Sequence, residues 1–242
     1  KRTVPSGGTV MKKGDLRKQE ILRTAEQMFC RKGYEQTSIQ DILDQLKTSK
    51  GSFYHHFVSK DALLETLCNQ RAEQSKNSVI AGLCSYSKAS DQLDHLLTGM
   101  IPLRDEKLAF LLMLLPVFAL PEGKRLRISY CDSLKDSFHG PIRDSIEAGT
   151  RAGELHCEDP DIYADIVISI VNDLWMSVCD AIIQNEIIGN ETDLAELLHI
   201  TEQYRTAAER ILFLPYGSLI LIDIPSLKDL KEQIHIHWIK QA

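Results

Sequence analysis

Glycine, proline and aromatic residues are scarce in this sequence, and their scarcity excludes several protein classes. The 242 residues include 13 Gly and 8 Pro, and aromatic residues make up only 7%. Together with 43% hydrophobic and 26% charged residues, this composition excludes collagen-like and low-complexity chains and is typical of a globular protein. Because Leu, Ile and Ala are plentiful, we expect a mainly helical fold.

The chain also lacks paired cysteines and a long uncharged apolar run. Its six cysteines are scattered and form no C-x-x-C pair, a pattern typical of reduced thiols in a large cytoplasmic chain. The polar N-terminus does not resemble a secretory signal. The longest uncharged apolar run, Leu108–Leu120, has 13 residues, whereas a membrane helix needs about 20. We therefore predict a cytoplasmic protein that does not enter a membrane.

Positive charge is concentrated towards the beginning of the chain. Residues 1–60 contain 12 Lys and Arg but 6 Asp and Glu, whereas residues 61–242 contain 16 and 28. The first segment is therefore basic, although the whole chain has a net charge of −6. A basic end joined to an acidic body indicates that this end meets an anionic partner.

Apolar residues recur at helical spacing along most of the chain, and no βαβ alternation is present. The pattern predicts an all-α fold with a flexible arm at 1–11, a three-helix head at 12–60, a helical body at 61–214 and a C-terminal extension at 215–242. In the body, we expect helices near 90–103, 105–119, 122–152 (with a break at Gly140-Pro141), 159–188 and 192–214.

Residues 37–60 contain the most informative pattern. A short helix begins at Thr37 or Ser38, a turn follows at 47–49, and a second short helix covers 50–57. Two helices joined in this way form a helix-turn-helix, whose second helix fits the major groove of DNA. With Phe53 and Phe57 facing inward, the outer face of that helix carries hydrogen-bonding, neutral or basic groups and no acid.

This segment resembles the signature of the tetracycline-repressor (TetR) family. The resemblance lies in the run Thr48-Ser49-Lys50-Gly51-Ser52-Phe53-Tyr54-His55-His56-Phe57, followed by Ser59-Lys60-Asp61 and Leu63-Leu64. Upstream, Ala25, Phe29, Gly33-Tyr34 and Thr37-Ser38-Ile39 also fit. The turn departs from the family in having Lys47-Thr48 where a Gly and a small aliphatic residue are common. The match covers residues 15–67 and implies a helical fold, DNA binding and dimerisation.

The resemblance also implies two groups of DNA contacts. The candidates for reading bases are Gln40, Lys50, Gly51, Ser52 and His55. The candidates for contacting phosphates are Thr37, Ser38, Ser49, Tyr54, His56 and Lys60. Their chemistry agrees, because Lys can donate to guanine, Gln can pair with adenine and hydroxyl groups suit phosphate oxygens. For Gln40 a capping box with Thr37 is an equal alternative.

Methionine and aromatic residues between 100 and 176 are candidates for lining a cavity that takes a small, apolar effector. They are Met100, Phe110, Met113, Phe118, Phe138, Trp175 and Met176. For any single one of them, ordinary core packing is an equally good interpretation. An effector bound there is expected to lower the affinity for DNA.

The helix expected at 159–188 is apolar over more of its circumference than one core requires. We therefore predict a homodimer in which this helix and the one at 192–214 form a four-helix interface with twofold symmetry. Its predicted residues are Ile170, Leu174, Val178, Ile182, Leu197, Tyr204, Ala208 and Ile211. The alternative is that residues 215–242 cover the surplus apolar surface within the same chain.

These patterns predict a sequence-specific transcriptional regulator that binds a palindromic double-stranded DNA operator, most simply a repressor released by a small effector. No enzymatic activity, cofactor or metal site is expected, and His235-x-His237 beside Trp238 is interpreted as a packed or solvated tail. The alternative is a helical ligand-binding or catalytic protein whose head serves protein contacts. The acid-free face at 47–60 favours the regulator, since an enzyme would not need it.

Overall fold

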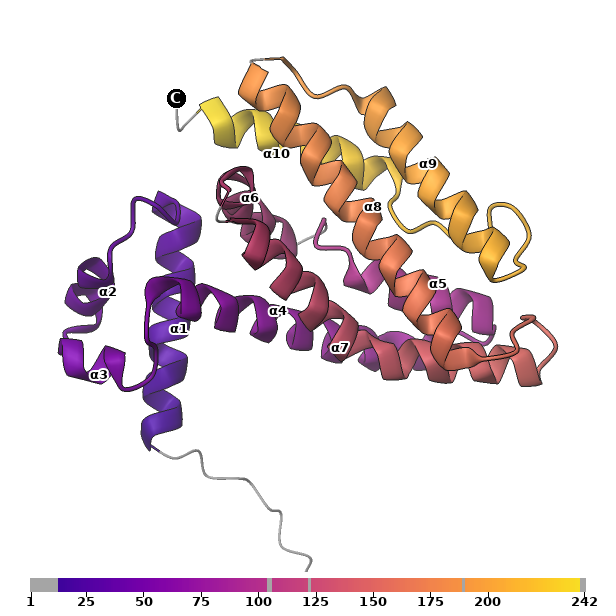
Figure 1. Cartoon of the computed structure of the whole chain (residues 1–242), viewed down its shortest axis with the longest axis horizontal. Helices are drawn as coiled ribbons and strands as arrows, with labels where there is room; N and C mark the ends of the chain where they lie inside the picture. The colour runs from indigo at the N-terminus through magenta and orange to yellow at the C-terminus, as the bar shows by residue number, and fades with distance from the viewer. Residues whose placement is uncertain (1–12, 104–105, 122, 189, 240–242) are drawn as a thin grey trace, which may run out of the picture. The chain divides into compact units, whose positions relative to one another are not determined.

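The computed structural model describes residues 13–103, 106–121, 123–188 and 190–239, so the arm expected at 1–11 lies outside the described residues. Within these ranges the regular elements are helices, which confirms the all-α prediction (Figure 1). They are α1 (Lys13–Lys32), α2 (Ile39–Leu46), α3 (Lys50–Tyr54), α4 (Lys60–Gly82), the short 3₁₀ turn η1 (Leu83–Ser85), α5 (Ala89–Met100), α6 (Glu106–Ala119), α7 (Gly123–Arg151), α8 (Pro160–Ile188), α9 (Leu194–Ile211) and α10 (Ile224–Ile239). The side chains of His235, His237 and Trp238 are not among the described ones.

The chain divides into two units, which we call the head (Lys1–Leu67) and the body (Cys68–Ala242). The division falls within α4, beyond the boundary expected at residue 60. Leu63, Leu64 and Leu67 are buried in the head. The first turns of α4 therefore belong to the head, and the remainder of the same helix belongs to the body.

Short-range contacts set the ends of α1 and α2 in the head, and α2 begins after Ser38, one of the two starts predicted. Gly33 ends α1 with a φ of +87°, and its N–H donates to the Phe29 carbonyl at 2.8 Å. Ser38 and Asp41 form the capping box of α2, because the Asp41 N–H donates to Ser38 Oγ at 3.1 Å and the Ser38 N–H donates to Asp41 Oδ2 at 2.8 Å. Lys47 ends α2 in the left-handed conformation, with a φ of +50°.

In the body, α8 lies against α7 on one side and α9 on the other (Figure 1). By length and composition, its segment Pro160–Asn185 could cross a membrane. However, 61% of the most apolar stretch of 18 residues in this segment is buried inside the body. The core helix of a globular domain has the same character. The break expected at Gly140-Pro141 is wrong, since α7 continues through Pro141 while Phe138, Ile142 and Ile146 stay buried on its inner face.

Most of the residues predicted for the dimer interface are buried within the single chain. Five of the eight predicted side chains are fully buried within a single chain, and only Ile170, Tyr204 and Ile211 are partly exposed. The five are Leu174, Val178, Ile182, Leu197 and Ala208. Helices α5, α6, α7 and α9 of the same body pack on α8 and bury most of its apolar circumference, although Ile162 and Ile166 remain exposed. Helix α10 packs in turn on α6 and α9.

Candidate nucleic-acid interface and effector cavity

The second helix of the helix-turn-helix begins at a side-chain cap. Ser49 is the N-cap of α3, and its Oγ accepts a hydrogen bond from the Ser52 N–H at 3.3 Å. The helix proper ends at Tyr54, earlier than predicted, but the turn continues because the Phe57 N–H donates to the Phe53 carbonyl at 3.0 Å. A short helix of this kind is stable only when it packs on its neighbours.

Two phenylalanines hold α3 and the turn after it against the head. Phe53 is fully buried and Phe57 is 3% exposed, and their ring centroids are 5.7 Å apart. The inward orientation predicted for both residues is therefore confirmed. It fixes which face of α3 points to solvent.

That solvent face carries most of the predicted contact residues. Lys50, Gly51, Tyr54 and His55 are exposed, and Ser52 and His56 are partly exposed. Desolvation lowers the pKa of His56, and the neighbouring His55 lowers it further, which favours the neutral imidazole. Lys47, which the sequence places in the turn, is exposed at the end of α2.

The packing within the chain does not explain why position 51 is a glycine. A Cβ atom built at this position would have Ser49 Oγ, at 3.9 Å, as its nearest neighbour, which is an ordinary contact distance. Packing in the chain therefore does not require glycine, which disfavours a helix by about 1 kcal/mol relative to alanine. A close approach of the backbone to another molecule, as predicted for this position, is one use of such a glycine.

Two of the predicted phosphate contacts have structural roles in the head. Thr37 is fully buried, and its Oγ1 donates to the Gly33 carbonyl at 2.8 Å. Lys60 Nζ donates to the carbonyls of Tyr34 and Thr37 at 3.0 and 3.2 Å and lies 4.0 Å from the centre of the Tyr34 ring. These contacts fasten the loop between α1 and α2 to the start of α4.

The same loop is held by Tyr34, whose hydroxyl donates to the Asp61 carboxylate. Burial raises the pKa of Tyr34, and the hydrogen bond to Asp61 raises it further, so the hydroxyl keeps its proton and remains a donor. Gln40, by contrast, is exposed, and its Nε2 donates to Asp44 Oδ1 at 2.7 Å instead of closing a capping box with Thr37.

Replacing Lys60 by alanine is expected to loosen the head. Two hydrogen bonds from a charged donor and one contact with an aromatic face are lost, so we expect local stability to fall by about 1–3 kcal/mol. Hydrogen exchange of the segment 34–46 in the full chain measures this loss. Lys50→Ala is the matched control, because its exposed side chain should change local stability by less than about 0.5 kcal/mol. If hydrogen exchange is unchanged in Lys60→Ala while DNA binding is weaker, Lys60 contacts a phosphate, as the sequence predicts.

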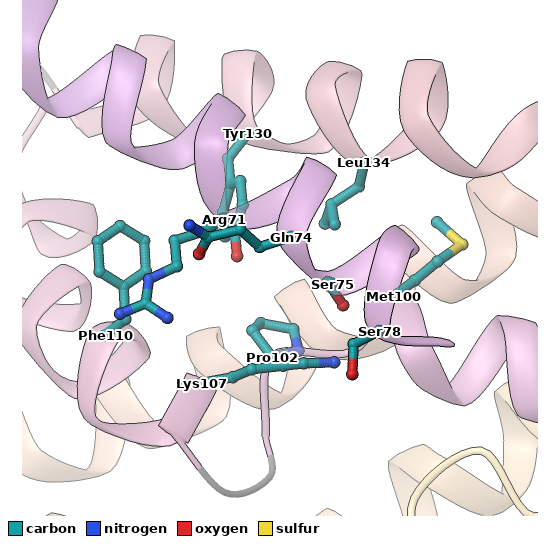
Figure 2. Close-up of a pocket in the computed structure, with 10 residues that line it drawn as sticks. All are labelled: Arg71, Gln74, Ser75, Ser78, Met100, Pro102, Lys107, Phe110, Tyr130 and Leu134. Carbon is teal, nitrogen blue, oxygen red and sulfur yellow. The ribbon is translucent and has the colours of Figure 1, made fainter. Parts of the chain in front are cut away.

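The body contains a cavity of about 50 Å³ between α4, α6, α7 and the segment after α5 (Figure 2). Two of the seven predicted effector residues, Met100 and Phe110, line it. The other five are not among its lining residues: Met113, Phe118, Phe138 and Trp175 are core residues, and Met176 is partly exposed.

The lining includes polar side chains that the search for apolar residues missed. Four of them share one face of α4 at positions i, i+3, i+4 and i+7, and Lys107 and Tyr130 come from α6 and α7. The four are Arg71, Gln74, Ser75 and Ser78. Their helical spacing on an inward face was a signal in the sequence, since polar residues at core spacing need a reason to be there. The cavity is therefore mixed in character, whereas we had predicted an apolar one.

These elements define a class of protein, namely an all-helical chain with a helix-turn-helix head on a helical body. A family model described as bacterial regulatory proteins, tetR family, matches residues 21–67. The resemblance to the TetR family that the sequence shows in residues 15–67 is thereby confirmed for this part of the chain.

Curated relatives agree with this assignment. YerO of Bacillus subtilis, an uncharacterized HTH-type transcriptional regulator, is 40% identical over 63 residues, which are 26% of this chain and 22% of YerO. The HTH-type transcriptional repressor KstR2 of Mycolicibacterium smegmatis is 27% identical over 176 residues, covering 67% of this chain and 78% of KstR2. The similarity to YerO, to YuxN of the same organism and to a Lactococcus lactis regulator spans only 22%, 17% and 37% of their lengths.

A solved structure extends the likeness to the body. A transcriptional regulator from Saccharomonospora viridis, crystallised in complex with choline, superposes with a TM-score of 0.53 at 21% identity. The superposition covers 81% of this chain and 96% of that one. At this identity the match establishes a common fold and no more.

Proposed function

We propose that the chain is a cytoplasmic transcriptional regulator that binds a palindromic DNA operator through its head and is released by a small effector bound in the body. The observation that carries the proposal is α3, whose exposed face presents Lys50, Gly51 and His55 while Phe53 anchors it from behind. In a helix-turn-helix protein the N-terminal residues of this helix contact base edges. Lys50 and Ser52 read bases, and Ser38, Ser49, Tyr54 and His56 contact phosphates.

The proposal includes a homodimer, because a palindromic operator is read by two heads about 34–36 Å apart. Each head then contributes one α3 to one half-site. The outer surfaces of α8 and α9 supply the contact, with the partly exposed Ile170, Tyr204 and Ile211 as the remaining candidates from the predicted set. Repression follows if the occupied operator excludes the transcription machinery.

The route from effector to DNA runs along α4. This helix begins in the head, where Lys60 fastens the loop before α2, and continues in the body, where Arg71 and Ser75 line the cavity. An effector that binds one placement of α4 more tightly than another changes the spacing of the heads, and its differential affinity sets the size of the effect.

Binding to DNA from the protein's own promoter region tests the proposal. Lys50→Ala is expected to relax base preference, with a loss of about 1–3 kcal/mol on the specific site, and Tyr54→Ala to weaken specific and non-specific binding alike. Lys228→Ala, an exposed lysine of α10, is the control for charge and should bind as the parent does. Titrations at two salt concentrations against competitor DNA measure both quantities.

Absence of DNA binding by the parent chain at low salt would contradict the proposal. It would favour a head that contacts protein, since electrostatic attraction to phosphates is strongest under that condition. A catalytic role, the other part of the alternative, has no support from the face of α3, whose lysine and histidines lie on an open surface.

A further inference from the structure

The cavity in the body has a cationic side and an apolar side. Arg71 extends from α4, and Lys107 reaches the cavity from α6 (Figure 2). Met100, Phe110 and Leu134, each about 1% exposed, supply apolar surface. None of the ten described residues that line the cavity is acidic.

Both cations are positioned by contacts with the cavity wall. The Arg71 guanidinium lies 5.5 Å from the centre of the Phe110 ring. Lys107 Nζ donates to the Gly99 carbonyl at 3.0 Å, and Ser75 Oγ donates to the same oxygen at 2.6 Å. An ammonium group has three donors, so the bond to Gly99 is compatible with a ligand oxygen on the same nitrogen.

Tyr130 adds a neutral donor. Its side chain is 4% exposed, and burial raises the pKa of its hydroxyl, which therefore keeps its proton at physiological pH. A phenol in this state donates a hydrogen bond to an anion and would not repel one. Its ring also lies 5.7 Å from that of Trp175, which places a fluorescent side chain beside the cavity wall.

The size of the cavity limits what fits. A volume of about 50 Å³ is well below the roughly 300–1,000 Å³ of most small-molecule sites. The cavity has room for a small anionic head group. A tail attached to that group fits only if a side chain that lines the cavity moves aside. Met100 is the wall residue best suited to move, because its unbranched side chain adopts several shapes at low cost.

We propose that the effector is a monocarboxylate with an apolar tail, its carboxylate held by Arg71 and Lys107 and its tail lying against Met100 and Leu134. The planar guanidinium matches the geometry of a carboxylate, which a single ammonium does not. This inference rests on the proposed function, because the bound anion is an effector only if its binding changes the affinity for DNA. It also replaces the apolar effector expected from the sequence.

Titration calorimetry of the full chain without DNA tests the site, with hexanoate as the probe and hexanol, hexylammonium and acetate as comparisons. Hexanoate is expected to bind at least about tenfold more tightly than hexanol or hexylammonium, because a charged acceptor gains the most from cationic donors. Acetate should bind more weakly than hexanoate, because it lacks the tail. Equal binding of hexanol and hexanoate, or no binding of hexanoate, would overturn the inference.

Variants locate the site. Arg71→Gln and Lys107→Gln are each expected to weaken hexanoate binding by about tenfold or more, since each removes a charged hydrogen-bond donor. Lys228→Gln, which removes an exposed charge of α10, should leave the affinity unchanged. Melting curves of each variant establish that the body still folds. Two folded variants that bind hexanoate as the parent does would place the anion elsewhere and refute the assignment.

A DNA titration separates this inference from the proposed function. If the parent chain binds promoter DNA and no carboxylate binds the cavity, the inference fails and the regulator stands. If hexanoate binds with the expected dependence on Arg71 and Lys107 but leaves DNA affinity unchanged, the anion site stands. In that case, release by an effector fails as part of the proposed function.

Discussion

Replacing Phe53 by alanine is expected to abolish DNA binding by the full chain. Its ring is fully buried between α3 and the remainder of the head, and large-to-small changes of a buried phenylalanine lower stability by about 3–5 kcal/mol. Because α3 has five residues and depends on packing, its placement is lost before that of α1. The measurement is promoter-DNA binding, combined with hydrogen exchange of residues 50–57.

Two controls give this experiment its meaning. Val58→Ala alters an apolar side chain that is 82% exposed just after the same turn, so DNA binding and exchange should remain at parental values. The near-ultraviolet circular dichroism of Trp175, which is buried in the body, should persist in Phe53→Ala, because the head and the body are separate units. A Phe53→Ala chain that still binds DNA with parental affinity would show that α3 does not carry the interface.

The head could be predicted because its signals are local. The capping box between Ser38 and Asp41 spans one helical turn, and the spacing of Phe53 and Phe57 defines an inward face within five residues. Each of these signals depends only on residues that are neighbours in the sequence, so the sequence alone is enough to predict it. The resemblance to the TetR family covers the same short segment.

The roles of Thr37 and Lys60 could not be predicted in the same way. Lys60 donates to carbonyls 23 and 26 residues earlier in the chain. A local pattern of residue types does not show which residues so far apart in sequence come into contact. A lysine in the first turn of a helix is unfavourable for the helix dipole, and we had explained it by a phosphate. The carbonyls of Tyr34 and Thr37 provide the negative partner within the head.

The burial of most residues predicted for the dimer interface has a related reason. Periodicity measures how much of a helix is apolar but not how many neighbours its own chain supplies. The sequence showed that α8 is apolar over most of its circumference, and four helices of the same body bury most of that surface while Ile162 and Ile166 remain exposed. The cavity also depends on long-range placement, because Arg71, Lys107 and Tyr130 come from three different helices.

Val178→Asp is therefore expected to unfold the body instead of separating two folded subunits. Val178 is fully buried on α8, next to the buried Cys179, and a carboxyl group placed there is desolvated. Such a substitution belongs to the exceptional class that lowers stability by more than about 4 kcal/mol. Urea unfolding followed by Trp175 fluorescence should show a large loss of stability or no folded baseline.

The matched variant is Ile128→Asp, an equally apolar position on α7 that is 55% exposed, which should unfold at nearly the same urea concentration as the parent. Sedimentation of the parent at micromolar concentration addresses the dimer itself, and a species near the chain mass of 27.4 kDa would contradict it. If Val178→Asp instead gives a folded monomer from a parental dimer, Val178 lies in the interface after all. The unfolding of Val178→Asp beside an intact Ile128→Asp would place the buried face of α8 in the core of one chain and leave only its outer surface for a partner.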